Sequence, residues 1–232
     1  MTNKEKFKDT LDNLHKELCD VSDWMYHNPE VGFEEYKTSK YLVNFIESKN
    51  TKVNYPSHNL DTAFDVTFGD SGPLVVLCVE YDALPEIGHA CGHNIIATAS
   101  IGAGLGLQDL ANDLGIRVKL LGTPAEEGGG GKIILLDNGA FEDAKCSMMI
   151  HPGYENVVNP TFTTIQQYTV EFFGKDAHAA GAPQEGINAL DAQIQLFVNA
   201  STYRQQMVQS NRMHGVIKEG GFKPNIIPSY TK

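Results

Sequence analysis

The stretch PLVVLCVEYDALP, residues 73–85, decides the fold. Its first half is a near-continuous apolar run, and the run ends in the charged segment Glu80-Tyr81-Asp82. A short apolar run rich in valine and leucine is typical of a β-strand that is buried on both faces, as in a parallel sheet covered by helices. Open α/β sheets hold their ligands in crevices at the carboxyl ends of the strands. We therefore expect ligand chemistry near Asp82.

Helices and strands alternate on both sides of this stretch. Apolar residues at helical spacing predict an amphipathic helix from Lys4 to His27, and a Pro/Gly break leads into a second helix over residues 34–48. The same patterns predict strands at 63–68, 116–122 and 144–151, and helices at 94–114 and 132–141. This alternation indicates an α/β fold with a mostly parallel central sheet flanked by helices.

The pattern changes near residue 165. Residues 163–180 read as a strand followed by a loop, and residues 185–207 read as a long amphipathic helix. Residues 214–221 and 225–232 look like two further strands of an α+β unit. The sequence therefore predicts two domains: residues 1–164, and a smaller inserted α+β domain from residue 165 to 232.

Composition narrows the classes of function. The chain of 232 residues has 18 basic and 29 acidic residues, a net charge of −11, so long-range electrostatics disfavour nucleic acid and anionic membranes. It contains no apolar run of the roughly 18 residues that a membrane span needs. The charged N-terminal segment lacks a signal-peptide core, and a cytoplasmic location is expected. The four cysteines form no CxxC pair, which argues against a disulfide framework or a zinc ribbon.

Three separate strand ends carry side chains that can bind metals. Asp82 is followed closely by Cys91 and His93 in the segment GHACGHN (88–94); adjacent Glu126 and Glu127 follow the strand at 116–122; a histidine, His151, ends the strand at 144–151. Equivalent ends of parallel strands lie at one edge of a sheet. The coincidence indicates a single polar site at that edge.

Each of these residues also has an ordinary structural reading. Cys91 and His93 alone could be core residues. The two side chains of a C-x-H pair point to the same side in a turn or an extended segment, but not on a helix. The carboxylates of Glu126 and Glu127 could both be solvated on a loop, whereas burial would require a cation to compensate their repulsion. The glycine-rich segments match neither a P-loop nor a dinucleotide fingerprint, and no GxSxG motif is present.

The motifs together resemble a known family, the two-metal amidohydrolases and exopeptidases that include carboxypeptidase G, aminoacylase and the auxin-conjugate hydrolases. The carriers are HNPEVGFEE (27–35), EYDALP (80–85), GHACGHN (88–94), GTPAEEGGGGK (122–132), HP (151–152), GKDAHAA (174–180) and KPNIIPSY (223–230). They occur in the expected order over nearly the whole chain. Within the family, the chain looks most similar to the cytosolic Xaa-Arg or β-alanyl-lysine dipeptidase branch and to aminobenzoyl-glutamate hydrolases.

The resemblance implies a role for each site residue. Two divalent metal ions, zinc first and manganese as the alternative, would be bound by Cys91, His93, Glu127 and His151, with Cys91 bridging them. Asp82 would orient a metal ligand from outside.

The resemblance also implies the catalytic and substrate groups. Glu126 would be the general base. His178, in the second domain, would help hold the oxyanion, often across a homodimer, and Asn225 would contact the substrate carboxylate.

The resulting prediction is a metal-dependent amidohydrolase or dipeptidase that releases a free amino acid from a small dipeptide or N-acyl amino acid. The resemblance also implies a further segment with one more metal-binding histidine, so we expect the 232 residues to be an N-terminal fragment. Two alternatives stay open: a truncated, non-catalytic dimerising relative, and a structural zinc module. A spare carboxylate beside the ligands favours catalysis over the structural module, because catalytic zinc sites keep an open position.

Overall fold

The computed structural model describes residues 1–158 and 160–232. The chain forms two compact units, residues 1–157 and residues 158–232. The sequence-based boundary at residues 164 and 165 lies a few residues further along the chain. Each unit is described by itself.

The first unit is built on a four-stranded sheet. Its strands are β1 (Phe64–Phe68), β2 (Leu74–Val79), β3 (Arg117–Gly122) and β4 (Ala144–Met148), in the order β1-β3-β2-β4. Strand β2 runs parallel to both β3 and β4, and β1 pairs antiparallel with β3 at one edge. The predicted mostly parallel sheet is thus confirmed, and the apolar run 74–79 is one of its two inner strands.

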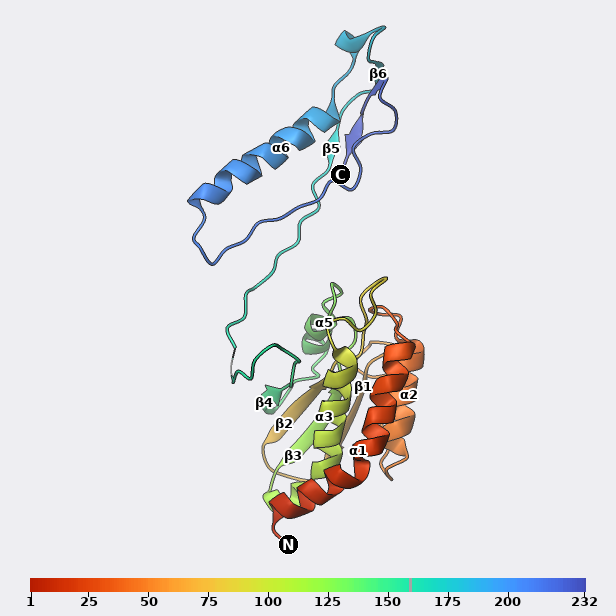
Figure 1. Ribbon diagram of the computed structural model, residues 1–232, viewed down its shortest axis with the longest axis vertical. Helices are drawn as coiled ribbons and strands as arrows, with labels where there is room; N and C mark the ends of the chain where they lie inside the picture. The colour runs from red at the N-terminus through yellow and green to blue at the C-terminus, as the bar shows by residue number, and fades with distance from the viewer. Residues whose placement is uncertain (159) are drawn as a thin grey trace. The chain divides into compact units, whose positions relative to one another are not determined.

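Both faces of the sheet are covered at β2, which explains the continuous apolar run. Alternate residues of β2 point to opposite faces: Leu77 and Val79 belong to one core cluster, whereas Val76 and Cys78 belong to a second. The first cluster packs against α1 (Asn3–His27), α2 (Tyr36–Glu47) and α3 (His93–Leu107). The second contains Leu135 of α5 (Gly131–Asp137). Figure 1 shows α1 and α3 together over one face of the sheet.

Helix α3 fits closely between the sheet and α1 because small residues line it. A Cβ atom on Gly104 would lie 2.5 Å from Leu120 Cδ2 of β3, and one on Gly102 would lie 2.9 Å from Leu18 Cδ1 of α1. The helix is shorter than predicted: residues 94–114 are α3 and a separate short α4 (Ala111–Leu114), not one helix. Left-handed Gly115 ends α4 and starts the turn into β3.

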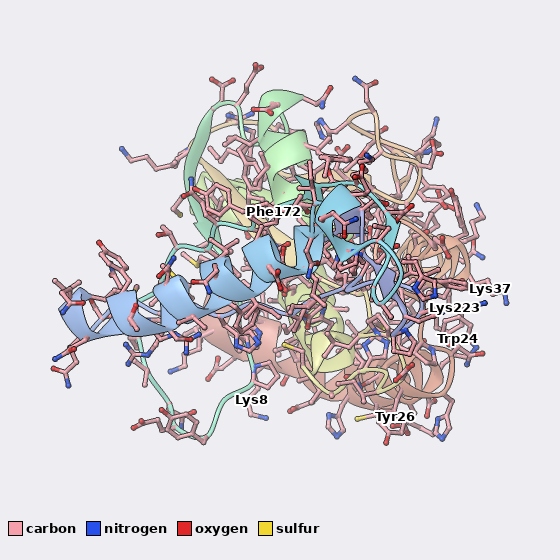
Figure 2. All side chains as sticks on the ribbon, turned by 90° about the horizontal axis from the view of Figure 1, so that it is seen from above. Lys8, Trp24, Tyr26, Lys37, Phe172 and Lys223 are labelled. Carbon is pink, nitrogen blue, oxygen red and sulfur yellow. The ribbon has the colours of Figure 1, made fainter. Side chains whose placement is uncertain are left out.

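Helix α1 begins with a capping box and is tied to α2 by aromatic stacking. The Thr2 side chain accepts from the Glu5 backbone N–H, and the Glu5 carboxylate accepts from the Thr2 N–H. Trp24, labelled in Figure 2, stacks on Tyr41 of α2 with ring centroids 4.0 Å apart. Within the described ranges, none of the helices combines the length and the apolarity needed to cross a membrane.

The second unit is an α+β arrangement with less strand than predicted. Strand β5 (Phe172–Phe173) pairs with β8 (Tyr230–Thr231), and β6 (Ala177–His178) pairs with β7 (Ile226–Ile227). Helix α6 (Ala189–Tyr203) lies within the predicted helix and is followed by a 3-10 turn, Arg204–Gln206; a second 3-10 turn, Pro183–Glu185, precedes it.

In this unit one predicted strand is much shorter than expected and another is absent from the described residues. Most of residues 163–180 is not strand, because only β5 and β6 pair, and residues 214–221 form no strand. Apolar side chains in these stretches, such as Ile165 at 80% and Tyr168 at 78%, are exposed. Apolar alternation requires a partner strand to become a ladder, and a sequence window cannot show whether that partner is present.

Candidate metal centre

The predicted metal-binding residues converge at one end of the sheet in the first unit. Asp82 follows β2, Glu126 and Glu127 follow β3, and His151 follows β4, while His93 is the first residue of α3. Two sets of residues could each hold a metal ion, because the ligand atoms within each set lie within 4.8 Å of one another. Both sets include His93: one adds Cys91 and His151, and the other adds Glu126 and Glu127. The expected meeting of three strand ends is therefore present in the structure.

His93 is fixed by its position and by one carboxylate. Gly92 at the N-cap has φ of +85°, so the chain turns through a left-handed residue and places Cys91 and His93 on the same side. The fully buried His93 ring has Nδ1 2.8 Å from the Asp82 carbonyl and 3.1 Å from Asp82 Oδ1. Both partners are acceptors, so Nδ1 carries the proton and Nε2 keeps its lone pair. Metal-binding histidines are oriented in this way.

His151 turns one ring nitrogen, Nε2, toward Cys91. Its Nδ1–H donates to the Pro152 carbonyl at 2.8 Å, and its Nε2 lies 3.5 Å from Cys91 Sγ. Sulfur and nitrogen ligands of one tetrahedral zinc ion lie roughly 3.3–3.6 Å apart, given usual bond lengths. Burial, followed by the nearby Glu127 carboxylate, raises the pKa of the Cys91 thiol to about 12. A bound cation would reverse that effect and favour the thiolate.

Carboxylates crowd the free nitrogen of His93. Its Nε2 atom lies 3.4 Å from Glu80 Oε2, 3.8 Å from Glu126 Oε2 and 3.9 Å from Glu127 Oε1. Burial, and then the neighbouring Glu80, raise the pKa of Glu126. Lys132 pairs with Glu80 through its other oxygen.

Three buried atoms in this crowd have no hydrogen-bond partner among the described residues: Glu80 Oε2, His93 Nε2 and Glu127 Oε1. Buried polar atoms are almost always satisfied, and buried like charges require compensation. A divalent cation would meet both needs, so the residues present fit a metal ion.

Asp82 joins the two sides of this cluster. Its Oδ1 faces the His93 ring, and its Oδ2 accepts a 2.8 Å hydrogen bond from the Glu127 backbone N–H. Burial alone would raise the pKa of Asp82, but the hydrogen bonds from His93 and Glu127 bring it below its usual value. The carboxylate therefore stays ionised and holds a ligand side chain and the ligand loop at once.

The two predicted site residues of the second unit lie beside each other there. His178 of β6 pairs with Ile226 of β7, and the Ala179 N–H donates to the Asn225 carbonyl at 2.9 Å. His178 Nδ1 accepts from the N–H groups of Ala180 and Gly181, at 3.2 and 2.9 Å. The neutral ring therefore carries its proton on Nε2 and offers a donor.

Three residues of the cluster were not assigned from the sequence: Glu35, Glu80 and Lys132. Glu80 stands in the quoted strand end, two residues before Asp82, and alternation along an extended chain would have put both on one side. Lys132 follows the four glycines and pairs back to Glu80. Glu35, in HNPEVGFEE, reaches a loop 90 residues away, which no local pattern reveals.

Comparison with known proteins confirms the resemblance. Residues 163–232 match the family profile described as the peptidase dimerisation domain. The chain is 41% identical to the Xaa-Arg dipeptidase of Mus musculus, over 99% of this chain and 56% of that protein. It is 29% identical to a p-aminobenzoyl-glutamate hydrolase chain of Escherichia coli (strain K12), over 94% of this chain and 50% of that protein.

Solved structures show the same fold. A dinuclear metal-binding peptidase of the M20 family from Bacillus subtilis superimposes with a TM-score of 0.61 at 21% identity, over 95% of this chain and 63% of that chain. This chain spans about half the length of the curated relatives it matches. It is therefore similar over nearly all of its length to roughly half of each relative.

Proposed function

We propose that this chain carries the metal centre of an amidohydrolase or dipeptidase, which cleaves an amide bond and releases a free amino acid. The observation that supports this most is the convergence of Cys91, His93 and His151 with the Glu126–Glu127 pair. They surround buried atoms that have no hydrogen-bond partner in the part of the chain that the structure describes. A spare carboxylate beside a set of nitrogen and sulfur donors is the arrangement that hydrolysis needs.

The donor set supports a two-ion centre. Cys91, His93 and His151 would hold one divalent ion, and Glu127, which groups with His93 and Glu126, would bind a second. Mixed sulfur and nitrogen donors favour zinc, with manganese as the alternative. When bound, such ions polarise the amide carbonyl and make water a stronger acid.

Glu126 is the proposed general base. Its side chain is 46% exposed at the edge of the cluster, so water and substrate can reach it. Its raised pKa brings the carboxylate nearer to the range in which it can take a proton from water and later give it to the leaving amine. Asp82 keeps His93 in the tautomer that leaves Nε2 available.

His178 and Asn225 are the proposed substrate contacts from the second unit. A protonated Nε2 on His178 is the donor that an oxyanion requires. Asn225 would contact the carboxylate of the substrate. Because residues 163–232 match a dimerisation domain, we propose that the protein forms a homodimer. His178 of one protomer would then help hold the oxyanion in its own site or in that of the partner. Analytical ultracentrifugation of the chain tests this association, and a monomer at all concentrations would contradict it.

The proposed substrate is a dipeptide with a basic C-terminal residue. The support is the 41% identity to an Xaa-Arg dipeptidase and, weakly, the net charge of −11, which favours cationic ligands. An N-acyl amino acid or aminobenzoyl-glutamate is the second candidate, since the chain is also similar to an aminobenzoyl-glutamate hydrolase.

A cytoplasmic location belongs to the same proposal. A metal-binding Cys91 must stay out of disulfides, and reducing compartments keep cysteines reduced. Cell fractionation checks it.

The deciding experiment is a hydrolysis assay after loading with Zn²⁺ or Mn²⁺. Xaa-Arg, Xaa-Lys and Xaa-Glu dipeptides, an N-acetyl amino acid and aminobenzoyl-glutamate form the substrate panel. We expect release of the basic amino acid by the wild type, and a loss of about 10²–10⁴-fold in Glu126→Gln with its metal content unchanged. Full activity in Glu126→Gln would remove the general base from the proposal. Substrate binding without cleavage under either metal would favour a non-catalytic relative.

A further inference from the structure

We propose that Glu35 is a positioning residue that holds the Glu126–Glu127 loop in its working conformation. The inference rests on the proposed function, because it gives Glu126 its task. The inference goes beyond the proposed function because it assigns a role to a residue 90 positions before Ala125 in the sequence. The Glu35 carboxylate contacts the backbone of the loop and not a candidate metal ligand side chain.

Glu35 is fully buried and its contacts are long-range. It stands at the N-cap of α2, yet within the described residues its side chain makes no capping hydrogen bond. Its Oε1 accepts from the Ala125 N–H at 2.8 Å, and its Oε2 accepts from Thr62 Oγ1 at 2.9 Å. The Thr62 carbonyl in turn accepts from the fully buried Tyr81 hydroxyl at 2.6 Å. Both carboxylate oxygens are therefore fixed by buried groups.

The residue that Glu35 holds has an unusual backbone. Ala125 has φ of +56°, in the left-handed region that side chains other than glycine rarely adopt. Such a conformation persists only when its surroundings over-determine it, and it clusters at functional sites. Ala125 immediately precedes Glu126, so its backbone sets the direction in which the proposed base leaves the loop.

The loop is held on both sides of Glu126 by buried carboxylates. Glu35 takes the N–H of Ala125, and Asp82 takes the N–H of Glu127 at 2.8 Å. Gly32, from the same segment as Glu35, lets the loop approach: a Cβ there would lie 3.0 Å from Ala125. The base is thus flanked by two fixed peptide groups, although its own side chain is half exposed.

A purely stabilising role does not account for a carboxylate at this position. Burying a carboxylate without a basic partner is unfavourable, and burial raises the pKa of Glu35. Among the described residues, no ion pair involves Glu35. What the carboxylate offers there is two acceptors at a fixed place, one of them for Ala125.

The first test compares Glu35→Ala with Glu35→Gln, and uses exposed Glu34→Ala as the matched control. A misplacement of about 1 Å at a catalytic group can cost roughly 100-fold. We expect Glu35→Ala to lower kcat about 100-fold with KM nearly unchanged. Glu35→Gln should stay near the wild type, because its amide oxygen still accepts from Ala125. Unchanged kcat in Glu35→Ala, or an equal loss in Glu34→Ala, would overturn the proposal.

The second test is rescue by backbone freedom. Glycine adopts positive φ without a steric penalty, so Ala125→Gly should restore much of the kcat lost in Glu35→Ala. A double variant no better than Glu35→Ala would show that Glu35 acts in another way. If Glu35→Ala is unfolded by circular dichroism, Glu35→Met, which fills the space without an acceptor, takes its place.

A third measurement does not depend on activity. Amide hydrogen exchange over residues 124–131 should accelerate in Glu35→Ala and not in Glu34→Ala, because the Ala125 N–H loses its acceptor. If the wild type hydrolyses nothing, the proposed function fails while this readout still tests the hold on the loop. Unchanged exchange in Glu35→Ala would overturn the positioning role by itself.

Discussion

The two halves of the ligand cluster are built differently. On the His93 side, the candidate ligands His93 and Glu127 are tied to one buried carboxylate, although the Glu126 side chain beside them is half exposed. His93 is 0% exposed, and Asp82 bonds both its ring and the backbone of Glu127. On the His151 side, the histidine is exposed and follows β4, four of whose five residues are exposed. Among the described residues, its hydrogen bonds are to Cys91 and to the neighbouring Pro152.

The His93 side is therefore formed by folding itself, whereas the His151 side contributes a possible ligand atom and few other contacts. Groups on the His93 side are held by the same hydrogen bonds that complete the core, so their geometry is present before any ion binds. His151 is placed only by the end of an edge strand. Changes on the two sides should therefore have different consequences for metal affinity and for folding.

The largest effect is expected where one side chain serves both ligand and loop. Asp82→Asn keeps the shape but replaces one ionised acceptor with an amide. Partners of this kind usually change metal affinity by about 10–100-fold, and we expect a loss of that size. Competition with a chelator of known affinity measures it. An unchanged affinity would mean that the His93 side is not oriented by Asp82.

A smaller effect is expected at the ion pair behind His93. Lys132→Met leaves the buried Glu80 carboxylate without its cation. We expect a loss of about 1–2 kcal/mol in the free energy of unfolding of the metal-free protein. This is less than for a fully buried pair, because the Lys132 side chain is 31% exposed. Urea unfolding of the wild type and variant gives the value, with Lys145→Met as a control; equal losses in both would contradict the role of the pair.

The smallest effect on folding is expected at His151. Replacing an exposed residue outside the core usually changes the free energy of unfolding by at most about 0.5 kcal/mol. Metal-free His151→Ala should therefore unfold at nearly the same temperature as the metal-free wild type. The same variant should lose the extra thermal stability that bound metal gives the wild type, because ligands stabilise only the state that binds them. Thermal melts with and without metal check both statements. A destabilised metal-free variant would show that the two halves are not different.

The same contrast shows what sequence reasoning can reach. The convergence of Asp82, Glu126 and His151 was predictable because parallel strands end at one edge, and one buried run, 74–79, revealed the sheet. Glu35 was not predictable, since its contact spans 90 residues and depends on how α2 packs. The prediction of a strand at 214–221 was wrong for the same reason, because a strand forms only where a second segment pairs with it. Antiparallel β1 was likewise hidden, since strand direction leaves no mark on a local pattern.

The exposed β4 has a practical consequence for handling the chain. It lies at the end of the strand order, and within the described ranges no further strand pairs with its outer side. A free edge presents unpaired N–H and C=O groups that can pair with strands of other chains. Met148, the last residue of β4, and Ile150, two residues after it, are both exposed. Solutions of the 232-residue chain should therefore become turbid as concentration rises, and a charged substitution such as Met148→Lys should keep them clear.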